Sequence, residues 1–437
     1  MPIDADRMLI GVSETYDVIV TMPNDKSYEF LATAEDRTKS ASLWLGNGDS
    51  VPATRLPRLK YFDGMKMMNG MMNMDGSMND MGMKMSLQQM DMNTVMYAEN
   101  LDKTVTLNYA MLRSPEKTML PDAPARELHF NLSGNMNRYV WTINNRAVSE
   151  TDKILIKKGE NIRIILYNGT MMRHPMHLHG HFFRLINGQG EYSPLKTVVD
   201  IMPMETDTLE FAATESGDWF FHCHILYHMM SGMGRIFSYE NSRANPEIPD
   251  PAAGLRKIYA DDRKIHLAAK IGLETNGSDG ELNFNNTRYR FQTEWRIGLN
   301  NTDGYETESH IGRYIGAIQW LLPYVGWDFR HKKGDAAERN IFGSESSLTD
   351  RRAFCIGLEY TLPMLITADA RLDTKGRIRF QLSREDVPVS SRMRLNFMVN
   401  SDKEYMAGLR YVLTKYISAS THYDSDMGYG AGITFTY

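Results

Sequence analysis

The chain has 437 residues, a formal net charge of −5 and a hydrophobic content of 42%, which is ordinary for folded protein. A charge so near neutrality gives no basic face, so we do not expect nucleic acid as a partner. Two cysteines, Cys223 and Cys355, lie far apart in stretches of different character. This spacing argues against a disulfide framework and favours a single functional thiol.

The N-terminal region has the composition of β structure. This region lacks the basic segment and the apolar run of a signal peptide. The chain contains no stretch of about 20 apolar residues, so no transmembrane helix is predicted. The short β-type runs between residues 1 and 51 are too few to close a sandwich by themselves. We therefore expect residues 1–51 to be the remnant of a preceding domain, inside which the chain begins.

Residues 52–104 are predicted to be a linker, and they are unusually rich in methionine. The neighbours of these methionines are Gly, Asn, Asp and Lys, so packing in a core is not expected. Thioethers select Cu(I) over hard cations, which makes the segment a possible Cu(I)-binding site, and a low-complexity linker is the alternative. The candidate ligands are Met65, Met67, Met68, Met71, Met72, Met74, Met78, Met81, Met83 and Met85.

Residues 105–242 alternate short β-type runs with Gly, Asn and Ser-Gly turns. The runs include "RELHFNL", "RYVWTIN", "IRIILYN", "TLEFAA" and "DWFFHC". This spacing, without a convincing amphipathic helix, predicts a β-sandwich of two sheets. A Pro-rich break, "NPEIPDPAAG", marks residues 243–262 as a second linker.

Residues 263–437 contain about ten longer runs, such as "RYRFQTEWRIGLN" and "GRIRFQLSRED". One set of alternate positions is rich in Tyr, Phe, Leu and Ile, and the other in Arg, Glu, Gln and Thr. In a soluble domain the apolar set would face a second sheet, whereas in a membrane barrel it would face lipid. Run lengths of about ten residues and the C-terminal aromatic favour the membrane barrel, with Tyr314, Trp320, Tyr324 and Trp327 suited to an interfacial belt.

Two motifs gather most of the chain's histidines, "HPMHLHGHFF" at residues 174–183 and "HCHILYHMMSGM" at residues 222–233. Residues two apart on a strand point the same way, so His222 and His224 should face one side and Cys223 the other. His177 and His179 form another pair on one face. One metal can therefore bind the thiolate while others bind the flanking imidazoles.

The set His174, Cys223, His228 and a more distant Met233 is the ligand combination of a blue-copper electron-transfer site. Zinc sites rarely recruit methionine, so copper is the predicted metal. A single His-x-His is more often a packed or surface pair, but here several ligand spacings coincide. His181 fits no ligand position and is expected to be structural. The remaining histidines, which we interpret as isolated and ordinary, are His129, His266, His310, His331 and His422.

These motifs resemble the two C-terminal copper motifs of multicopper oxidases. "SGNMNRYVWTINN" and "GDWFFHCHILYHMMSGM" resemble the last cupredoxin domain of bacterial copper-resistance oxidases of the copper-resistance protein A type, and "GVSETYDVIV" resembles the end of their middle domain. The resemblance implies an all-β fold with a cupredoxin-type Greek-key sandwich at residues 105–242. It implies type 1 copper at His174, Cys223, His228 and Met233, type 2 copper at His177, type 3 copper at His179, His222 and His224, and catalytic electron transfer through Cys223, His222 and His224.

The chain departs from the family pattern in its number of histidine pairs. The family builds its oxygen-reducing cluster from eight histidines, and two His-x-His pairs come from its first domain. This chain supplies four of these ligands, and its first histidine is His129. We therefore expect the C-terminal part of a longer oxidase, completed by cupredoxin domains or another chain. A degenerate electron-transfer or copper-binding protein is the alternative.

The C-terminal region resembles the outer-membrane copper-resistance protein B barrel in "LLPYVGWDFRHKKGD" and in its aromatic end. The resemblance implies an antiparallel β-barrel of about ten strands that tethers a periplasmic oxidase to the outer membrane. The expected activity is oxidation of Cu(I) or another small reductant coupled to reduction of O2 to water. A copper-sequestering protein and an outer-membrane copper pore or receptor are the alternatives, and no metal-ligand cluster is expected in the barrel.

Overall fold

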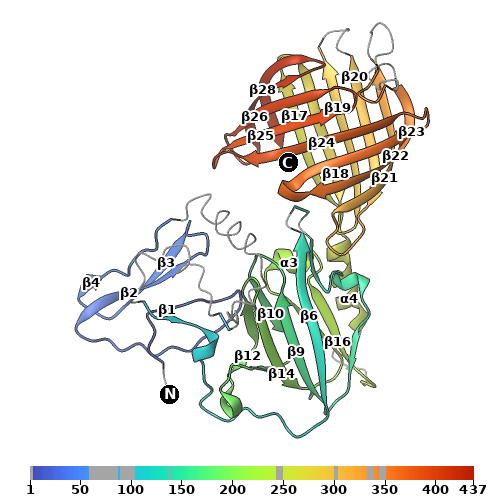
Figure 1. The fold of residues 1–437 in the computed structure, drawn as a ribbon. Coiled ribbons are helices and arrows are strands. Elements are labelled where there is room, and N and C mark those ends of the chain that lie inside the picture. The colour runs from blue at the N-terminus through green and yellow to red at the C-terminus, as the bar shows by residue number, and fades with distance from the viewer. Residues whose placement is uncertain are drawn as a thin grey trace.

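The computed structural model describes residues 3–58, 87–88, 104–135, 137–138, 140–242, 250–299, 304–331, 339–343 and 351–437. The candidate methionine ligands from Met65 to Met85 lie outside the described residues, so the Cu(I)-binding segment stays a prediction. The described chain is built almost entirely of β-strands, arranged as a small N-terminal sheet, a sandwich and a barrel (Figure 1). The prediction of an all-β fold is confirmed.

The N-terminal region forms a small sheet and one strand that joins it to the sandwich. The sheet has the order β3-β2-β4 and contains β2 (Lys26–Thr33), β3 (Ser40–Leu45) and β4 (Asp49–Val51). The strand β1 (Arg7–Met8) pairs in parallel with β5 (Thr106–Leu107), beyond the methionine-rich segment. Residues far apart in the sequence are therefore joined at the start of the sandwich.

The sandwich consists of a five-stranded and a six-stranded sheet. The strand orders are β13-β10-β15-β16-β8 and β12-β11-β14-β9-β6-β7. The non-sequential neighbours in both sheets reflect the crossing connections expected for a Greek-key fold. The strands are β6 (Ala125–Asn135), β7 (Val140–Ile143), β8 (Ile154–Ile156), β9 (Asn161–Asn168), β10 (His174–Leu178), β11 (Phe183–Leu185), β12 (Leu195–Lys196), β13 (Val198–Ile201), β14 (Thr206–Ala212), β15 (Asp218–Cys223) and β16 (Gly234–Tyr239).

The core of the sandwich follows from strand alternation. Along β9 the buried side chains are Ile162, Ile164 and Leu166, while the residues between them are more exposed. Phe221 on β15 and Phe237 on β16 meet them from the other sheet within one continuous buried cluster. Removing this apolar surface from water stabilises the sandwich, by about 25 cal/mol for each Å² buried.

Within the residues that the structure describes, helical segments are few and short. They are the α-helices α3 (Leu226–Met230) and α4 (Pro251–Arg263) and the 3-10 helices η2 (Tyr109–Met111), η3 (Val148–Glu150), η4 (Gly190–Tyr192) and η5 (Pro363–Leu365). The helix α4 occupies much of the segment that we expected to be a linker. Its Pro251 is favoured at a helix start, and the buried Asp262 accepts a hydrogen bond from the Ser149 amide at 3.0 Å. None of the helices in the described part of the chain has the length and hydrophobicity to span a membrane.

The C-terminal region is a closed antiparallel barrel, and the described residues contribute twelve strands to it. Pairing of β17 with β28 closes the barrel, with Lys270 opposite Thr436. The strands are β17 (His266–Glu274), β18 (Gly277–Asn285), β19 (Tyr289–Gly298), β20 (Tyr305–Arg313), β21 (Leu321–His331), β22 (Arg351–Leu362), β23 (Ile366–Asp373), β24 (Ile378–Pro388), β25 (Met393–Asn400), β26 (Tyr405–Val412), β27 (Ile417–Asp424) and β28 (Gly428–Thr436). The predicted barrel is confirmed, but its strand number was underestimated because polar strands such as β18 and β27 have weak hydrophobic alternation.

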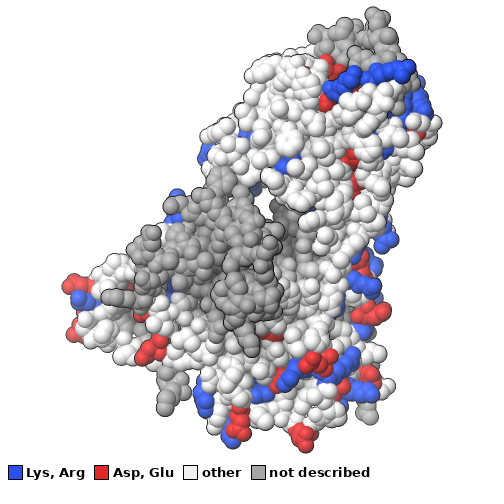
Figure 2. All heavy atoms as spheres, in the orientation of Figure 1, with Lys and Arg blue, Asp and Glu red and all other residues white. Residues whose placement is uncertain are grey.

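The barrel has an apolar outer surface and a polar interior. On β22 the outward residues Phe354, Ile356 and Leu358 are exposed, whereas Ala353 and Cys355, which alternate with them along the strand, are buried. Figure 2 shows a wall that is largely free of charged side chains, with charges gathered near one end. Two of the four aromatics assigned to a belt, Tyr314 and Tyr324, are in fact buried.

The sandwich contacts the barrel through the turn between β6 and β7 and through η3. The Arg138 guanidinium donates a hydrogen bond to the Asn286 carbonyl at 2.8 Å and stacks over Tyr314, 3.2 Å from its ring centroid. Arg288, in a turn of the barrel, forms an ion pair with Glu150 at 2.5 Å. Figure 1 shows α3 and α4 at the end of the sandwich that faces the barrel.

Candidate metal centre

Three predicted ligands meet in the sandwich core, and we call His174, Cys223 and His228 the ligand triad. His174 begins β10, Cys223 ends the neighbouring strand β15, and His228 lies on α3. The Cys223 Sγ atom lies 3.6 Å from His174 Nδ1 and 3.5 Å from His228 Nδ1, and the two Nδ1 atoms are 3.1 Å apart. The three donor atoms therefore converge on one point.

The separations in the ligand triad suit a shared metal ion. Donors bound at about 2.0–2.3 Å with angles of about 100–120° lie roughly 3.1–3.8 Å apart. All three side chains are almost fully buried, so little water competes for the site. Two imidazoles and one thiol form the soft donor set that suits copper. The residues present therefore fit the predicted type 1 copper.

Hydrogen bonds orient His174 for metal binding. Its Nε2 lies 2.7 Å from the Thr170 hydroxyl, which donates its own proton to the Asn168 side-chain oxygen at 2.8 Å. The Thr170 oxygen must therefore accept from Nε2, which places the ring proton there and leaves the Nδ1 lone pair free for a metal. Sequence inspection did not identify Thr170 and Asn168, because neither residue is itself a metal ligand.

Burial keeps the ligand triad uncharged until a metal binds. Desolvation lowers the pKa of His174 well below its usual range, assisted by the neighbouring His228, and lowers the pKa of His228 to about 4. Desolvation also raises the pKa of the Cys223 thiol. Both imidazoles are therefore neutral at physiological pH, and a metal that takes the thiolate must displace a proton.

Two further residues, Trp141 and Met233, lie beside the ligand triad. The Trp141 ring on β7 lies 4.2 Å from the His228 ring and 5.5 Å from the His174 ring, measured between centroids. Met233 is fully buried, and its carbonyl accepts a hydrogen bond from the Cys223 amide at 3.2 Å. Met233 is thus beside the triad, and its role as a thioether ligand remains a prediction.

The four other predicted ligands, His177, His179, His222 and His224, lie together, and we call them the histidine cluster. Their neighbouring ring centroids are separated by 4.7 to 5.6 Å. Register explains the grouping, since His177 on β10 is paired directly with His222 on β15. The Nε2 atoms of His179 and His222 face one another at 3.0 Å.

Backbone carbonyls orient two members of the histidine cluster. The His177 Nδ1 group donates to the Thr197 carbonyl at 2.8 Å, and the His222 Nδ1 group donates to the Cys223 carbonyl at 2.9 Å. Each ring thereby presents its Nε2 lone pair to the cluster. Desolvation lowers the pKa of His222 to about 4, so this imidazole is also neutral and able to bind a metal.

The ligand triad and the histidine cluster lie on opposite sides of one strand. Cys223 points into the sandwich core, whereas His222 and His224 point away from it, as strand alternation predicts. Only the backbone of adjacent residues separates the thiol from these imidazoles. A short covalent path therefore connects the two groups.

His181 is structural, as expected. Its Nδ1 group donates to the His179 carbonyl at 2.8 Å, and its Nε2 accepts a hydrogen bond from the Tyr239 hydroxyl at 2.6 Å. Both ring nitrogens are thus occupied within the protein, and neither is available to a metal.

The N-terminal segment also reaches the histidine cluster. The Ser13 hydroxyl lies 3.3 Å from His224 Nδ1. The neighbouring Glu14 is buried and forms an ion pair with Lys196 at 2.6 Å, and it accepts a hydrogen bond from the Tyr109 hydroxyl at 2.8 Å. A segment of the N-terminal region is therefore anchored at the edge of this cluster.

A second three-residue group lies inside the barrel. Among the described residues, potential ligand atoms of three His, Cys, Asp or Glu residues approach within 4.8 Å in two places, the ligand triad and the group His310, Asp328 and Cys355. The expectation that His310 is isolated was therefore wrong, because its ring lies beside Asp328 and Cys355 in an arrangement that could hold a metal ion. The three residues lie on different strands, so their spacing in the sequence carries no signal.

Comparison with known proteins supports the interpretation of the sandwich. Residues 122–243 match a family described as multicopper oxidase. A copper resistance protein A homolog of Pseudomonas syringae pv. tomato is 30% identical over 282 residues, which cover 54% of this chain and 48% of that protein. Multicopper oxidase MmcO of Mycobacterium tuberculosis is 28% identical and matches 55% of this chain and 40% of that protein. The predicted oxidoreductase family of this domain, and copper as its cofactor, are confirmed.

The similarity covers only part of each protein. The chain spans about half or less of the length of these curated relatives. Among solved structures, a multicopper oxidase from Campylobacter jejuni is 23% identical and matches 28% of this chain and 32% of that chain, with a TM-score of 0.25.

Proposed function

We propose that the sandwich is the electron-accepting copper domain of an oxidase that acts in copper resistance. The convergence of three buried donor atoms in the ligand triad carries this proposal, because few other roles bring a thiol and two neutral imidazoles so close. His174, Cys223 and His228 would hold the copper, and its chemistry would be one-electron transfer from a reductant toward dioxygen. Cu(I) or another small reductant is the proposed substrate, and O2 the proposed acceptor.

The residues of the sandwich have separate roles in this proposal. His174 and His228 would offer neutral Nδ1 lone pairs to the metal, Cys223 would offer the thiolate, and Met233 would offer a weaker thioether. Thr170 holds the His174 ring in its binding tautomer. Cys223 also provides the covalent connection to His222 and His224, which lie on the far side of the strand.

The histidine cluster is proposed to be half of an oxygen-reducing centre. His177 would hold a type 2 copper, and His179, His222 and His224 would contribute to a type 3 pair. The remaining ligands would come from further cupredoxin domains or another chain. The small N-terminal sheet supports this, because its large apolar residues Phe30, Leu43 and Trp44 are exposed as if a partner normally covered them.

The methionine-rich segment is proposed to deliver Cu(I). Its thirteen methionines between Met65 and Met96 are set among small and polar residues, as suits a carrier of soft ligands. The ligand triad lies at the end of the sandwich that faces the barrel, since His228 is on α3. Cu(I) would therefore arrive at the ligand triad from the side of the sandwich that faces the barrel.

The barrel is proposed to tether the oxidase to the outer membrane, with the sandwich in the periplasm. The outward apolar positions and the charged lumen are what a lipid environment requires. The contacts of Arg138 and Arg288 would then hold the copper domain against one end of the barrel.

A second function is favoured by the incomplete histidine cluster. With four of the eight ligands that the family uses, this chain alone would bind copper and transfer electrons without reducing O2. Copper storage without turnover belongs to this alternative as well.

Copper content, spectra and oxygen uptake of the purified full chain test these proposals together. A type 1 site predicts one copper with an intense blue thiolate band and a type 1 EPR signal. Oxygen uptake with Cu(I), together with type 2 and type 3 signals, would require that the missing ligands come from an associated chain. Blue copper without oxygen uptake would support the electron-transfer alternative. A copper-loaded chain without the blue band would refute the proposed centre.

A further inference from the structure

Three strands of the barrel place His310, Asp328 and Cys355 on one patch of the lumenal wall, and we call them the lumenal cluster. His310 on β20 is paired with Gly326 on β21, and Gly326 is paired with Cys355 on β22, so the three residues form one row across the wall. Asp328 lies two residues further along β21 and points to the same side. From this arrangement we infer that the lumenal cluster is a second metal site, selective for a divalent transition metal such as Zn²⁺.

Gly326 makes the site possible by leaving the middle of the row empty. A Cβ atom at this position would lie 2.2 Å from His310 Cδ2 and 3.1 Å from Cys355 Sγ. The first distance is far below any normal carbon contact, so a side chain here would push the imidazole away. Because Gly326 has none, His310 and Cys355 approach one another above the backbone of the strand between them.

Neighbouring residues hold the histidine and the carboxylate in place. The Tyr324 ring stacks on His310 with a centroid distance of 4.5 Å. His310 Nε2 lies 3.0 Å from Asp328 Oδ1, while the other oxygen, Oδ2, accepts a hydrogen bond from Arg351 at 2.8 Å. The arginine thereby fixes the carboxylate and leaves Oδ1 directed at the imidazole. Such support from a second layer of residues is characteristic of metal sites.

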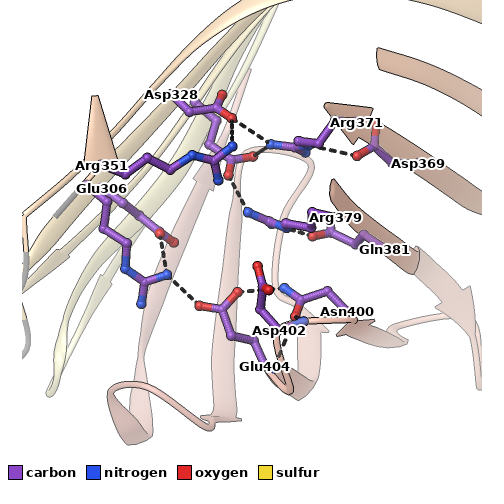
Figure 3. A network of polar contacts seen from close by, with 12 residues as sticks. Glu306, Asp328, Arg351, Asp369, Arg371, Arg379, Gln381, Asn400, Asp402 and Glu404 are labelled. Atoms are coloured by element: carbon purple, nitrogen blue, oxygen red, sulfur yellow. Dashed lines mark hydrogen bonds and ion pairs between the residues drawn. The ribbon is translucent and has the colours of Figure 1, made fainter. Parts of the chain in front are cut away.

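The positive charges near the site are matched by acids. Arg371 also lies near Asp328 Oδ2, at 3.3 Å, and forms ion pairs with Glu308 at 2.6 Å and Asp369 at 2.9 Å. Arg351 is 3.5 Å from a second carboxylate, Asp373. Figure 3 shows how this network surrounds Asp328. Because carboxylates neutralise both arginines, a metal cation beside Asp328 would not be repelled by uncompensated positive charge.

The donor set indicates the class of metal. An imidazole nitrogen, a carboxylate oxygen and a thiolate sulfur are the three ligand types that Zn²⁺ uses, and three protein ligands leave a fourth position for water or another small ligand. Hard cations such as Mg²⁺ and Ca²⁺ avoid thiolates. The site is separate from the ligand triad and extends beyond the function proposed for the sandwich. A hydrogen-bonded cluster without an ion is the competing interpretation.

The cysteine content of the chain permits a clean test with Co²⁺ as a spectroscopic probe for Zn²⁺. Cys223 and Cys355 are the only two cysteines, so in the full-length Cys223→Ser variant any cobalt–thiolate charge-transfer band must come from Cys355. Co²⁺ is titrated into this variant, then into versions that also carry Cys355→Ser, His310→Gln or Asp328→Asn. His422→Gln is the matched control, because His422 is another lumenal histidine and pairs instead with Glu274.

We expect a saturable band in the Cys223→Ser variant that Zn²⁺ abolishes by competition. Cys355→Ser should remove the band, His310→Gln and Asp328→Asn should weaken Co²⁺ binding at least tenfold, and His422→Gln should leave it unchanged. Absence of the band in the Cys223→Ser variant would overturn the site. A band that survives both His310→Gln and Asp328→Asn would overturn the ligand set and leave a lone thiol.

A measurement on the unsubstituted chain covers the case in which a variant fails to fold. Alkylation of Cys355, followed peptide by peptide with mass spectrometry, distinguishes it from Cys223. Zn²⁺ should slow this alkylation at least tenfold, whereas Mg²⁺ should not. Equal alkylation with and without Zn²⁺ would contradict the proposed site. A third sample contains Cu(I) in place of Zn²⁺. If Cu(I) slows the alkylation of Cys355 more than Zn²⁺ does, the site prefers copper and the inferred selectivity is overturned.

Discussion

The sandwich and the barrel use the same strand alternation with opposite polarity. On β9 of the sandwich the apolar set, with Ile162 and Leu166, is buried in the core. On β22 of the barrel the apolar set, with Phe354 and Ile356, is exposed on the outer wall. A period of two determines only that alternate residues share a face, and the surroundings determine which face is apolar.

The two regions also differ in which partners their buried charged side chains have. In the barrel lumen Arg371 and Arg330 are each within ion-pair distance of several carboxylates (Figure 3 includes Arg371). In the sandwich Glu205 and Asp207 are buried, and no ion pair within the described residues reaches them. They accept backbone hydrogen bonds instead, from residues such as Leu87 and Met202. Buried charge in the lumen is thus held in shared ion pairs, whereas the sandwich has both a buried pair, Glu14 with Lys196, and acids that accept backbone hydrogen bonds without an ion pair.

The largest expected effect concerns the ligand triad. Cys223→Ser should abolish the blue absorption and the type 1 EPR signal of the copper-loaded protein, because the thiolate is the source of the charge-transfer band. Cys355→Ser is the matched control, since its thiol lies in the barrel, and it should leave both signals intact. Loss of the blue band in Cys355→Ser rather than in Cys223→Ser would place the copper in the barrel and contradict its assignment to the sandwich.

The second prediction concerns paired charge in the barrel. Arg371→Met removes the cation that lies beside Glu308, Asp328 and Asp369, so it should lower the free energy of unfolding by about 3–5 kcal/mol. Urea titration of the protein in lipid vesicles measures this change. Arg352→Met, at an exposed position on the outer wall, should cost little or nothing. Equal costs for the two variants would contradict the distinction between lumen and wall.

The third prediction tests whether lipid surrounds the barrel. Ile356→Arg places a charge on the outer wall and should cost about 2–4 kcal/mol in vesicles. Leu155→Arg is the control on the sandwich, where the side chain is similarly exposed, at 52% against 59% for Ile356. An exposed position in water should tolerate the charge within about 0.5 kcal/mol. If Ile356→Arg is equally harmless in vesicles, the barrel wall does not face lipid.

The fourth prediction concerns the unpaired acids of the sandwich. Desolvation raises the pKa of Glu205 to about 7, so between about pH 4.5 and pH 7 the folded state holds a proton that the unfolded state has released. Raising the pH through this window should therefore destabilise the sandwich by roughly 3 kcal/mol. Glu205→Gln should flatten this dependence in thermal or urea unfolding, and it should also relieve Asp207 of a neighbouring charge. An unchanged slope in Glu205→Gln would contradict this assignment, and the exposed Glu116→Gln serves as the control.

The smallest effect is expected from the residue that orients His174. Thr170→Val keeps the shape of the side chain but removes the hydroxyl that accepts the His174 Nε2 proton. Copper affinity at the ligand triad should fall about 10-fold to 100-fold while the blue band persists. Competition with a copper chelator measures this change. The exposed Thr214→Val should leave the affinity unaltered, and a similar loss there would indicate a general effect on folding.

Local spacing was sufficient to predict which histidines of the sandwich lie together. His177 and His222 are two residues from another histidine, and alternation along a strand turns that spacing into a shared face. The helix α4 was missed because the Pro-rich composition of residues 243–262 indicates a break in structure, although Pro251 is favoured at the first turn of a helix. Two barrel strands were missed for a similar reason, since their polar runs give little periodic signal.

By itself the sequence determined the all-β class, the residues proposed as copper ligands and the alternation of the barrel strands, because each depends on residues close together in the chain. Only the tertiary structure decided that Thr170 orients His174 and that twelve strands close the barrel. It also decided that Gly326 lets His310 and Cys355 meet. The physical reason is that these features depend on strand register and on packing between distant segments, which no local pattern specifies.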